Sequence, residues 1–485
     1  MVDSRRWVLG GLSSLTLGWV LLMNLASVSA AEGPRSQAPV WVGNGSCAAT
    51  SCHGGARERV GLKGAEYSFS EAYDPHPKAY SVLFDDRSKQ IEKRYRRLAD
   101  LESARPWDDD ACLRCHVHQG YDSNASRSRT DRFTVADGAG CESCHGPASK
   151  WLAPHVEAGW KGLSDRQKFE GFGLRPSKDL LVRGKICAEC HVGIGSTDVN
   201  HDLIAAGHPR LNFEYGNQLA KLPKHWRIEA DLARNPDHEA RVWVLGQILG
   251  AKAALDLLES RATRSIPENS TAPWPEFAEY SCFSCHHSLV KNGWPSANTT
   301  LTARAGQFQW GTWYSPMTRV LRPVVPGPDP GSGEPIEDLL KEMMERPSPE
   351  PSVVARQARA ASANLARLAD RINGGLLPVA KVRAMLSEAV NSDADEQPLD
   401  WDRAARQYLA IIALDRTIGQ LDPNRSARPS RSGLEALRHD LELPRRLEGR
   451  PGLSDSPGPW KLEKIQADFD SLIENSPQAG RIGPR

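Results

Sequence analysis

Between residues 47 and 287 the chain has few regular runs of apolar residues, and the alternation that forms strands is scarce. This pattern favours short helices, turns and loops, with Arg132–Val135 as the segment that fits a short strand. Ala240–Ala262 differs, because it is apolar on most sides and is interrupted by polar residues such as Gln247 and Lys252. It predicts a buried helix that leads to the last cysteine pair, not a membrane span.

Beyond residue 287 apolar residues recur at helical spacing after a Pro/Gly-rich stretch, Pro323–Pro335, which predicts a linker or an irregular wrap. Three helices are expected there: Ser352–Asn373, which stops at Gly374, Leu377–Val390, and Trp401–Leu421, which Asp400 caps. Weaker patterns predict helices at Gly433–Leu443 and Trp460–Ile473. The apolar stripes favour an intramolecular helical bundle over an oligomer or partner surface.

The fold class is therefore mainly α, and 485 residues exceed one ordinary core. We expect a signal segment at 1–30, a cysteine-rich domain at 31–290, the linker or wrap at 291–350 and a helical region at 351–485. With Lys+Arg 61 against Asp+Glu 60, no basic excess points to nucleic acid.

The N-terminus has the pattern of an export signal. Arg5 and Arg6 precede an uncharged run, Trp7–Ala31, which ends in small residues. Cleavage after Ala30 is the favoured interpretation. The alternative is an uncleaved anchor, which alone would give the protein membrane contact. Both place the rest of the chain across the membrane, in a bacterial periplasm or its equivalent.

All 10 cysteines fall into five pairs, and a histidine follows the second cysteine of every pair. This spacing is the attachment signature of haem c, with thioethers from both sulfurs and the adjacent imidazole as the proximal iron ligand. Disulfides need no histidine, and zinc sites need four ligands for each ion. The predicted attachment sites are Cys47 and Cys52 with His53, Cys112 and Cys115 with His116, Cys141 and Cys144 with His145, Cys187 and Cys190 with His191, and Cys282 and Cys285 with His286. The first pair has a longer spacer, so a single thioether from Cys52, or no haem, is the alternative there.

Each iron has a second axial position. Whether a ligand fills this position decides between electron transfer and chemistry on a substrate. Residues 47–287 contain no methionine, so distal ligands must be histidine or something unusual, or the position is open. The eight histidines available there are His76, His118, His155, His201, His208, His225, His238 and His287. His118 is too close to His116 to cap the same iron, and either caps a neighbour or lies in a loop.

The order Cys112-Leu113-Arg114-Cys115-His116-Val117, then Gly140-Cys141-Glu142-Ser143-Cys144-His145-Gly146-Pro147, then His155, resembles the cytochrome c-554 family over roughly residues 47–195. These are multihaem electron acceptors of hydroxylamine oxidation in nitrifying bacteria, and His76-Pro77-Lys78-Ala79 is similar to their distal-ligand helix. The resemblance implies that His155 caps the iron of His53, that His76 caps that of His145, and that the iron of His116 is five-coordinate. For the irons of His191 and His286 we expect His201 and His208 as ligands, with His287 as competitor.

Three departures stand out: the long first spacer, His118, and a fifth haem followed by helices, as in hydroxylamine oxidoreductases and pentahaem nitrite reductases. The favoured function is electron transfer between redox protein partners through five mostly bis-histidine haems. The alternatives are an oxidoreductase acting on a small nitrogen or sulfur compound at one open iron, for which no catalytic residue is identified, and a haem-bearing scaffold that docks a partner.

Overall fold

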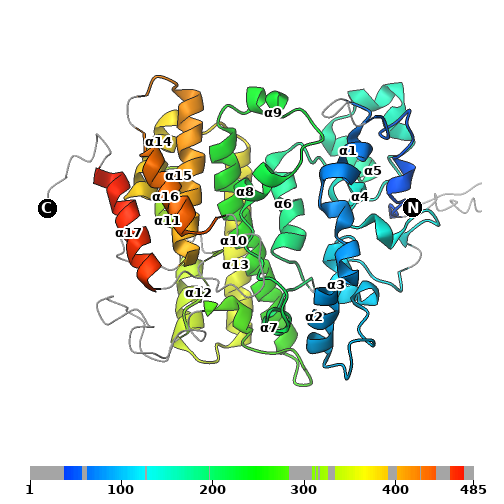
Figure 1. Ribbon diagram of the computed structural model, residues 1–485, viewed down its shortest axis with the longest axis horizontal. Helices are drawn as coiled ribbons and strands as arrows, with labels where there is room; N and C mark the ends of the chain where they lie inside the picture. Colours follow the sequence, from blue (N-terminus) through cyan, green and yellow to red (C-terminus); the bar gives the residue numbers. More distant parts are fainter. Residues whose placement is uncertain are drawn as a thin grey trace, which may run out of the picture. The chain divides into compact units, whose positions relative to one another are not determined.

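The computed structural model describes residues 38–56, 63–125, 128–195, 197–282, 308–311, 313–314, 317–325, 334–391, 401–425, 428–443 and 459–474 (Figure 1). The expected signal segment, Asp400 and the fifth-motif residues Cys285, His286 and His287 lie outside these residues. None of the described helices is both long enough and apolar enough to cross a bilayer.

Helices make up the regular structure of the described residues, so the expectation of a mainly α fold is confirmed. The α-helices are α1 (Glu66–Tyr73), α2 (Asp86–Arg96), α3 (Asp110–His116), α4 (Cys141–His145), α5 (Asp165–Phe172), α6 (Leu180–His191), α7 (His201–Ala206), α8 (Tyr215–Lys221), α9 (Ile228–Arg234), α10 (His238–Ser265), α11 (Thr318–Leu321), α12 (Glu334–Glu345), α13 (Pro351–Asn373), α14 (Val379–Val390), α15 (Trp401–Leu421), α16 (Arg431–Asp440) and α17 (Pro459–Glu474). Short 3-10 helices are η1 (Asn44–Ser46), η3 (His76–Lys78), η4 (Ser81–Phe84), η5 (Pro106–Asp108), η7 (Val135–Asp137), η8 (Pro154–Val156), η9 (Ala158–Gly162) and η10 (Phe277–Glu279). The β pairing among described residues is limited to isolated bridges, such as Trp41 with Arg129.

The helices after residue 350 bury their apolar stripes within the chain, as the bundle interpretation predicted. On α13, Val354, Ala358 and Leu365 are buried, and this helix packs along α10 (Figure 1). Burying a side chain of the size of leucine or valine stabilises a fold by about 1.5–3 kcal/mol. Amphipathic packing of this kind, more than helix propensity, holds such helices in place.

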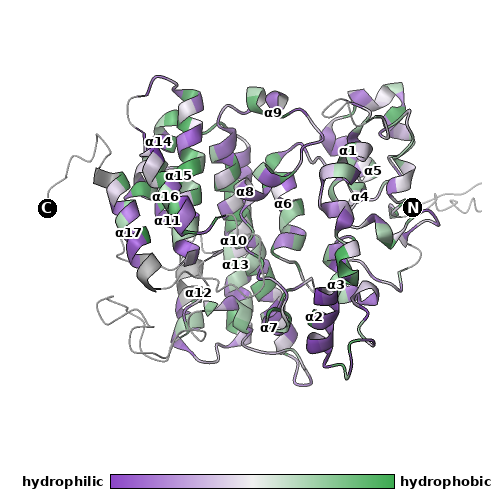
Figure 2. Ribbon diagram, in the orientation of Figure 1, coloured by the Kyte–Doolittle hydropathy of each residue, from purple (hydrophilic) through white to green (hydrophobic). Residues whose placement is uncertain are grey.

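One large core joins α6, α8 and α10 to the later helices α12–α17. Its centre is α10, whose Trp243, Leu245 and Leu258 are almost fully buried. The expectation of a buried helix at 240–262 is thereby confirmed. In Figure 2 the hydrophobic colour gathers on α10, α13 and α15, whereas α2 is mostly hydrophilic.

Residues 39–178 contain much less apolar packing. Two small clusters of buried residues serve this segment: one around Leu83, Leu113 and Tyr121, the other around Val42 and Trp151. The polypeptide alone therefore supplies little hydrophobic stabilisation to this segment, although it carries three of the attachment motifs.

Two expectations need correction or completion. The expected strand at Arg132–Val135 was wrong, because Val135 begins η7 and the Thr134 hydroxyl accepts a hydrogen bond from the Ala136 N–H. A threonine that caps a turn in this way competes with strand pairing. The interval 291–350, expected to be a linker or wrap, contains α11 and α12 in its described part.

Candidate haem-binding site

The second, third and fourth cysteine motifs lie at the C-terminal ends of helices. Helices α3, α4 and α6 each carry two cysteines one turn apart and finish on the motif histidine, His116, His145 and His191. Residues three apart share a helix face, so both thiols and the imidazole are directed to the same side. The first motif differs, because η1 ends before Cys47 and His53 follows in a turn.

Helix α4 is confined by the glycines on either side of it. Gly146 has a φ of 84°, and a Cβ there would lie 2.6 Å from the carbonyl oxygen of Gly173. Only glycine tolerates both the positive φ and this close approach. The helix consequently ends immediately after His145.

Glu142, inside the third motif, holds the first and third motifs together. Its buried carboxylate accepts hydrogen bonds from the backbone N–H groups of Val42, Gly43 and Ala148, at 2.7–3.0 Å. Burial raises the pKa of this carboxyl group, although the three N–H donors oppose the shift. Glu142 is therefore the acceptor that fixes the chain just before Cys47.

Replacing Glu142 by glutamine should destabilise the protein. The amide NH2 would face backbone N–H donors, so at least one buried donor would lose its acceptor, at a cost of about 1–3 kcal/mol. Thermal unfolding measures this change. The control is Glu170→Gln on the exposed face of α5, where the ion pair with Arg166 should contribute less than about 1 kcal/mol. Equal melting temperatures for both variants would contradict the role given to Glu142.

Hydrogen bonds fix the orientation of most imidazoles in this region. The Nδ1 atoms of His53 and His76 lie 2.9 and 2.7 Å from the carboxylates of Glu66 and Asp74. The Nδ1 atoms of His116 and His155 lie close to backbone carbonyl oxygens. A carbonyl oxygen only accepts, so Nδ1 carries the proton and Nε2 keeps its lone pair. Histidines that bind metals through Nε2 are oriented in this way.

Three histidine pairs lie at nearly the same separation. The ring centroids of His53 and His155 are 6.2 Å apart, those of His76 and His191 are 6.1 Å apart, and those of His145 and His225 are 6.2 Å apart. Each pair joins one motif histidine to one histidine outside the motifs.

This separation fits a metal between the rings. Because imidazole nitrogens bind first-row metals at about 2 Å, two axial imidazoles on one iron have ring centres roughly 6 Å apart. The surroundings also fit a bulky apolar group. The Cys144 side chain is exposed, and desolvation by the protein around it raises the pKa of its thiol to about 11. The residues present therefore fit haem.

Burial keeps these groups in their neutral forms. Desolvation lowers the pKa of His145 and of His191 to about 4, and raises the pKa of Cys112 and of Cys187 to about 12. A neutral imidazole is the form that binds iron, so these histidines need not lose a proton first. Among the described residues, no group of three or more His, Cys, Asp or Glu side chains could hold a bare metal ion.

Sulfur atoms of different motifs lie next to each other. A hydrogen bond to Cys141 lowers the pKa of Cys47, and the thiols of Cys115 and Cys190 interact in the same way. The first motif is thus adjacent to the third, and the second to the fourth. The described cysteines form no disulfide.

The remaining predicted ligands are placed as follows. His201 begins α7, and its ring meets the edge of Phe277. His208 donates from Nδ1 to the carbonyl oxygen of Pro209. Desolvation lowers the pKa of His208 to about 4, and the nearby His116 contributes to this shift. His225, which the sequence left unassigned, lies beside His145. His76 lies beside His191, whereas the resemblance implied that it would face His145.

His118 is part of the protein packing. Its ring stacks on Trp41 with centroids 3.8 Å apart, and its edge meets Tyr121 and Phe133. Its Nε2 is covered by protein atoms, which leaves no room for an iron there. Of the two interpretations left open by the sequence, the structure supports a loop residue, which packs just after α3.

Replacing His118 by phenylalanine should leave the iron ligands unchanged. The phenyl ring keeps the stack on Trp41 and removes only the polar atoms. We expect the ferric absorption and electron paramagnetic resonance spectra to match those of the wild type. A new high-spin signal in this variant would show that His118 is a ligand.

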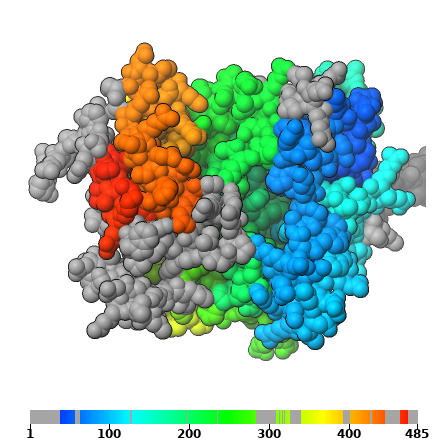
Figure 3. Space-filling view, in the orientation of Figure 1, coloured from blue at the N-terminus to red at the C-terminus, as the bar shows by residue number. Residues whose placement is uncertain are grey.

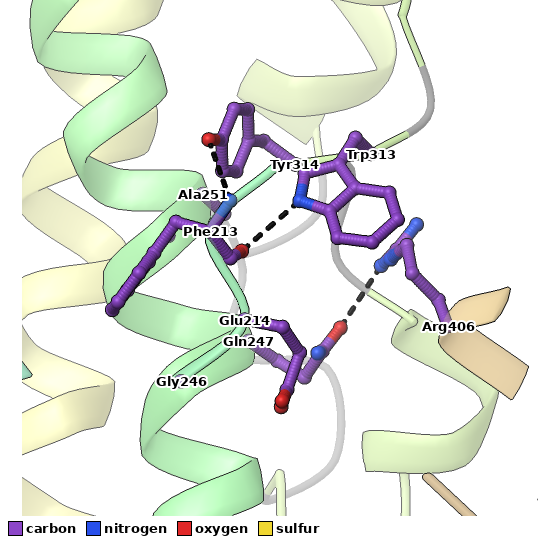
Figure 4. Close-up of a pocket in the computed structure, with 9 residues that line it drawn as sticks. Phe213, Glu214, Gly246, Gln247, Ala251, Trp313, Tyr314 and Arg406 are labelled. Carbon is purple, nitrogen blue, oxygen red and sulfur yellow. Dashed lines mark hydrogen bonds between the residues drawn. The ribbon is translucent and has the colours of Figure 1, made fainter. Parts of the chain in front are cut away.

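Two hollows elsewhere in the described residues are not haem sites. Figure 4 shows one between Phe213, Gln247, Trp313 and Arg406, with a free volume of about 10 Å³, room for one water molecule. A larger hollow of about 110 Å³ lies beside α10, near Tyr280 and Trp310. No motif cysteine or histidine lines either hollow.

Comparison with known proteins identifies the first part of this region. A family model described as "Cytochrome c554 and c-prime" matches residues 47–146. Residues 47–146 are therefore similar to the cytochrome c554 family. Cytochrome c-554 of Nitrosomonas europaea is 28% identical to the chain over 122 residues, which are 24% of this chain and 48% of the relative. The chain thus spans about half the length of the curated relative that it matches, and no solved structure matches it.

The c554 segment contains the first three attachment motifs and His76. His155, His191 and His225 all lie beyond its last matched residue. The resemblance seen in the sequence is therefore confirmed, while the fourth and fifth motifs and the helical C-terminus fall outside the matched segment.

Proposed function

We propose that this protein is a multihaem c-type cytochrome that passes electrons through five covalently bound haems, most of them with two histidine ligands. The observation that carries the proposal is the set of three imidazole pairs at 6.1–6.2 Å, each containing one motif histidine. An iron with two imidazoles has no free position for a substrate, and it can change its oxidation state without exchanging a ligand.

The adjacency of motifs supports passage of electrons along the chain. The contact between Cys47 and Cys141, and that between Cys115 and Cys190, bring four attachment sites together in two pairs. When bound, haem supplies the redox chemistry. The protein supplies the thioether sulfurs, the oriented imidazoles and a surrounding that excludes water, which together set the potentials.

We also propose a periplasmic location and redox proteins as partners. The N-terminal sequence has the pattern of an export signal, whether cleaved or retained as an anchor, and haem c attachment takes place after export. The near-zero net charge gives no reason to expect nucleic acid. The division of the chain at residue 290, with the fifth haem held by Cys282, Cys285 and His286, is part of this proposal.

Spectroscopy of the oxidised holoprotein tests the function. We expect at least four-fifths of the ferric haem to be low-spin and not to bind cyanide, nitrite or hydroxylamine. High-spin signals from two or more haems, shifted by these ligands, would contradict an electron-transfer protein with mostly bis-histidine irons.

A second candidate function rests on His116. Its ring makes no ring contact with another described imidazole, and it is one of the groups that lower the pKa of the non-motif histidine His208. If His208 does not close this iron, one open position remains for a small nitrogen or sulfur compound. A single high-spin haem that shifts on adding hydroxylamine or nitrite, and that remains when His208 is replaced by alanine, would favour this candidate.

A further inference from the structure

We propose that the c554 segment and the chain that follows it exchange axial ligands: His225 caps the iron held by His145, and His76 caps the iron held by His191. This inference rests on the proposed function, because it names which imidazole closes which iron. It differs from the arrangement that the resemblance implies, in which His76 faces His145.

Two ring distances carry the inference. His145 and His225 have centroids 6.2 Å apart with an angle of 70° between the rings, and His76 and His191 are 6.1 Å apart at 84°. The angle between the rings does not restrict ligation, because each ring can rotate about its own bond to the metal.

His76 is held rigidly toward its partner. The Asp74 carboxylate accepts hydrogen bonds from both Nδ1 and the backbone N–H of His76, at 2.7 and 3.0 Å. The His76 carbonyl oxygen in turn accepts the backbone N–H of Ala139, at 3.0 Å. With Nδ1 engaged, Nε2 points away from Asp74 and is the nitrogen that can bind a metal.

His225 is held in place from both sides. The Nζ of the preceding Lys224 donates to the carbonyl oxygen of Leu219, at 3.0 Å. The indole N–H of the following Trp226 donates to Asp231 at 2.9 Å, and the guanidinium of Arg183 lies 4.7 Å from the Trp226 ring centre. Arg183 belongs to α6, the helix that ends in the fourth motif. The same helix therefore presents His191 and positions the loop that carries His225.

The consequence is that the c554 segment does not complete its own ligand set. The iron of His145 takes its second ligand from a residue far beyond position 146, and the iron of His191 takes one from inside the segment. Together with the link between His53 and His155, these two links join the two parts of the chain through three metals, in addition to their side-chain contacts.

Pairwise substitution in the full-length holoprotein tests the assignment. The background Cys141→Ala/Cys144→Ala lacks the haem of His145. In it, adding His225→Ala should create no further high-spin haem, whereas adding His76→Ala should create one. In the reciprocal background, Cys187→Ala/Cys190→Ala, His76→Ala should be silent and His225→Ala should create a high-spin haem. His439→Ala, which removes an exposed side chain on α16, is the control and should be silent in both.

The reverse pattern would overturn the assignment and restore the pairing of His76 with His145, yet it would leave the electron-transfer function intact. Failure of that function appears instead as several open irons in the wild type. If neither background accumulates, a crystal structure of the haem-loaded wild type decides the question. Nε2 of His225 bound to the His145 iron supports the proposal, and Nε2 of His225 bound to the His191 iron overturns it.

Discussion

Protein made without haem is expected to lose the fold of residues 39–178 and to keep that of the helical part from α10 onward. The first segment contributes two small clusters of buried apolar residues, whereas α10, α13 and α15 share the large core. Ordering each residue costs about 1–2 kcal/mol of backbone entropy, and burial returns only about 25 cal/mol per Å² of apolar surface. Without porphyrins, residues 39–178 do not bury enough apolar surface to offset this entropy cost.

Limited proteolysis with mass analysis measures this effect. Cytoplasmic expression without the attachment machinery gives the haem-free chain, and the exported holoprotein is the control. We expect rapid cleavage within 39–178 and protection of α10, α13 and α15. Equal protection of both segments in the haem-free chain would contradict the view that haem forms the core of the first.

Replacing His155 by alanine is expected to convert one low-spin iron to high-spin. His155 lies 6.2 Å from His53, its ring is nearly parallel at 16°, and its Nδ1 is engaged by the Leu152 carbonyl oxygen. Removing the imidazole opens one position on that iron, since the described residues place no other imidazole at this distance from His53. About one-fifth of the ferric haem should become high-spin and should bind added imidazole.

Absorption and electron paramagnetic resonance spectroscopy of the ferric protein provide the measurement. His439→Ala is the matched control, because that side chain is exposed and is removed from all the described motifs in sequence. Added imidazole should restore the low-spin spectrum of His155→Ala. An unchanged spectrum in the alanine variant would remove His155 from the ligand set.

Much of the fold was predictable because apolar periodicity reports burial. The helices expected at 352–373 and 401–421 appear as α13 and α15 with nearly the same ends, and α10 covers the stretch expected at 240–262. The packing of α10 against α13 was not predictable, because helical stripes show which face is buried but not which neighbour covers it. The strand expected at 132–135 failed because side-chain capping by Thr134 outweighs local alternation.

The candidate site, like the fold, was predictable only in part. Local spacing predicted the motif histidines and cysteines, since a thioether pair and its imidazole lie on one turn of chain. The proposed distal ligands come from far along the chain, so spacing carries no information about them. The surplus of histidines included His225 among the candidates, but only the position of the loop beside α6 brings it to His145.

The central claim is that haem is attached covalently at five places, and the mass of the mature protein tests it most directly. We predict a mass equal to the exported polypeptide plus five haems. Peptides from each motif should carry one haem, including the peptide that joins Cys47 to Cys52. A mass equal to the polypeptide alone, or motif cysteines joined to each other as disulfides, would contradict the account.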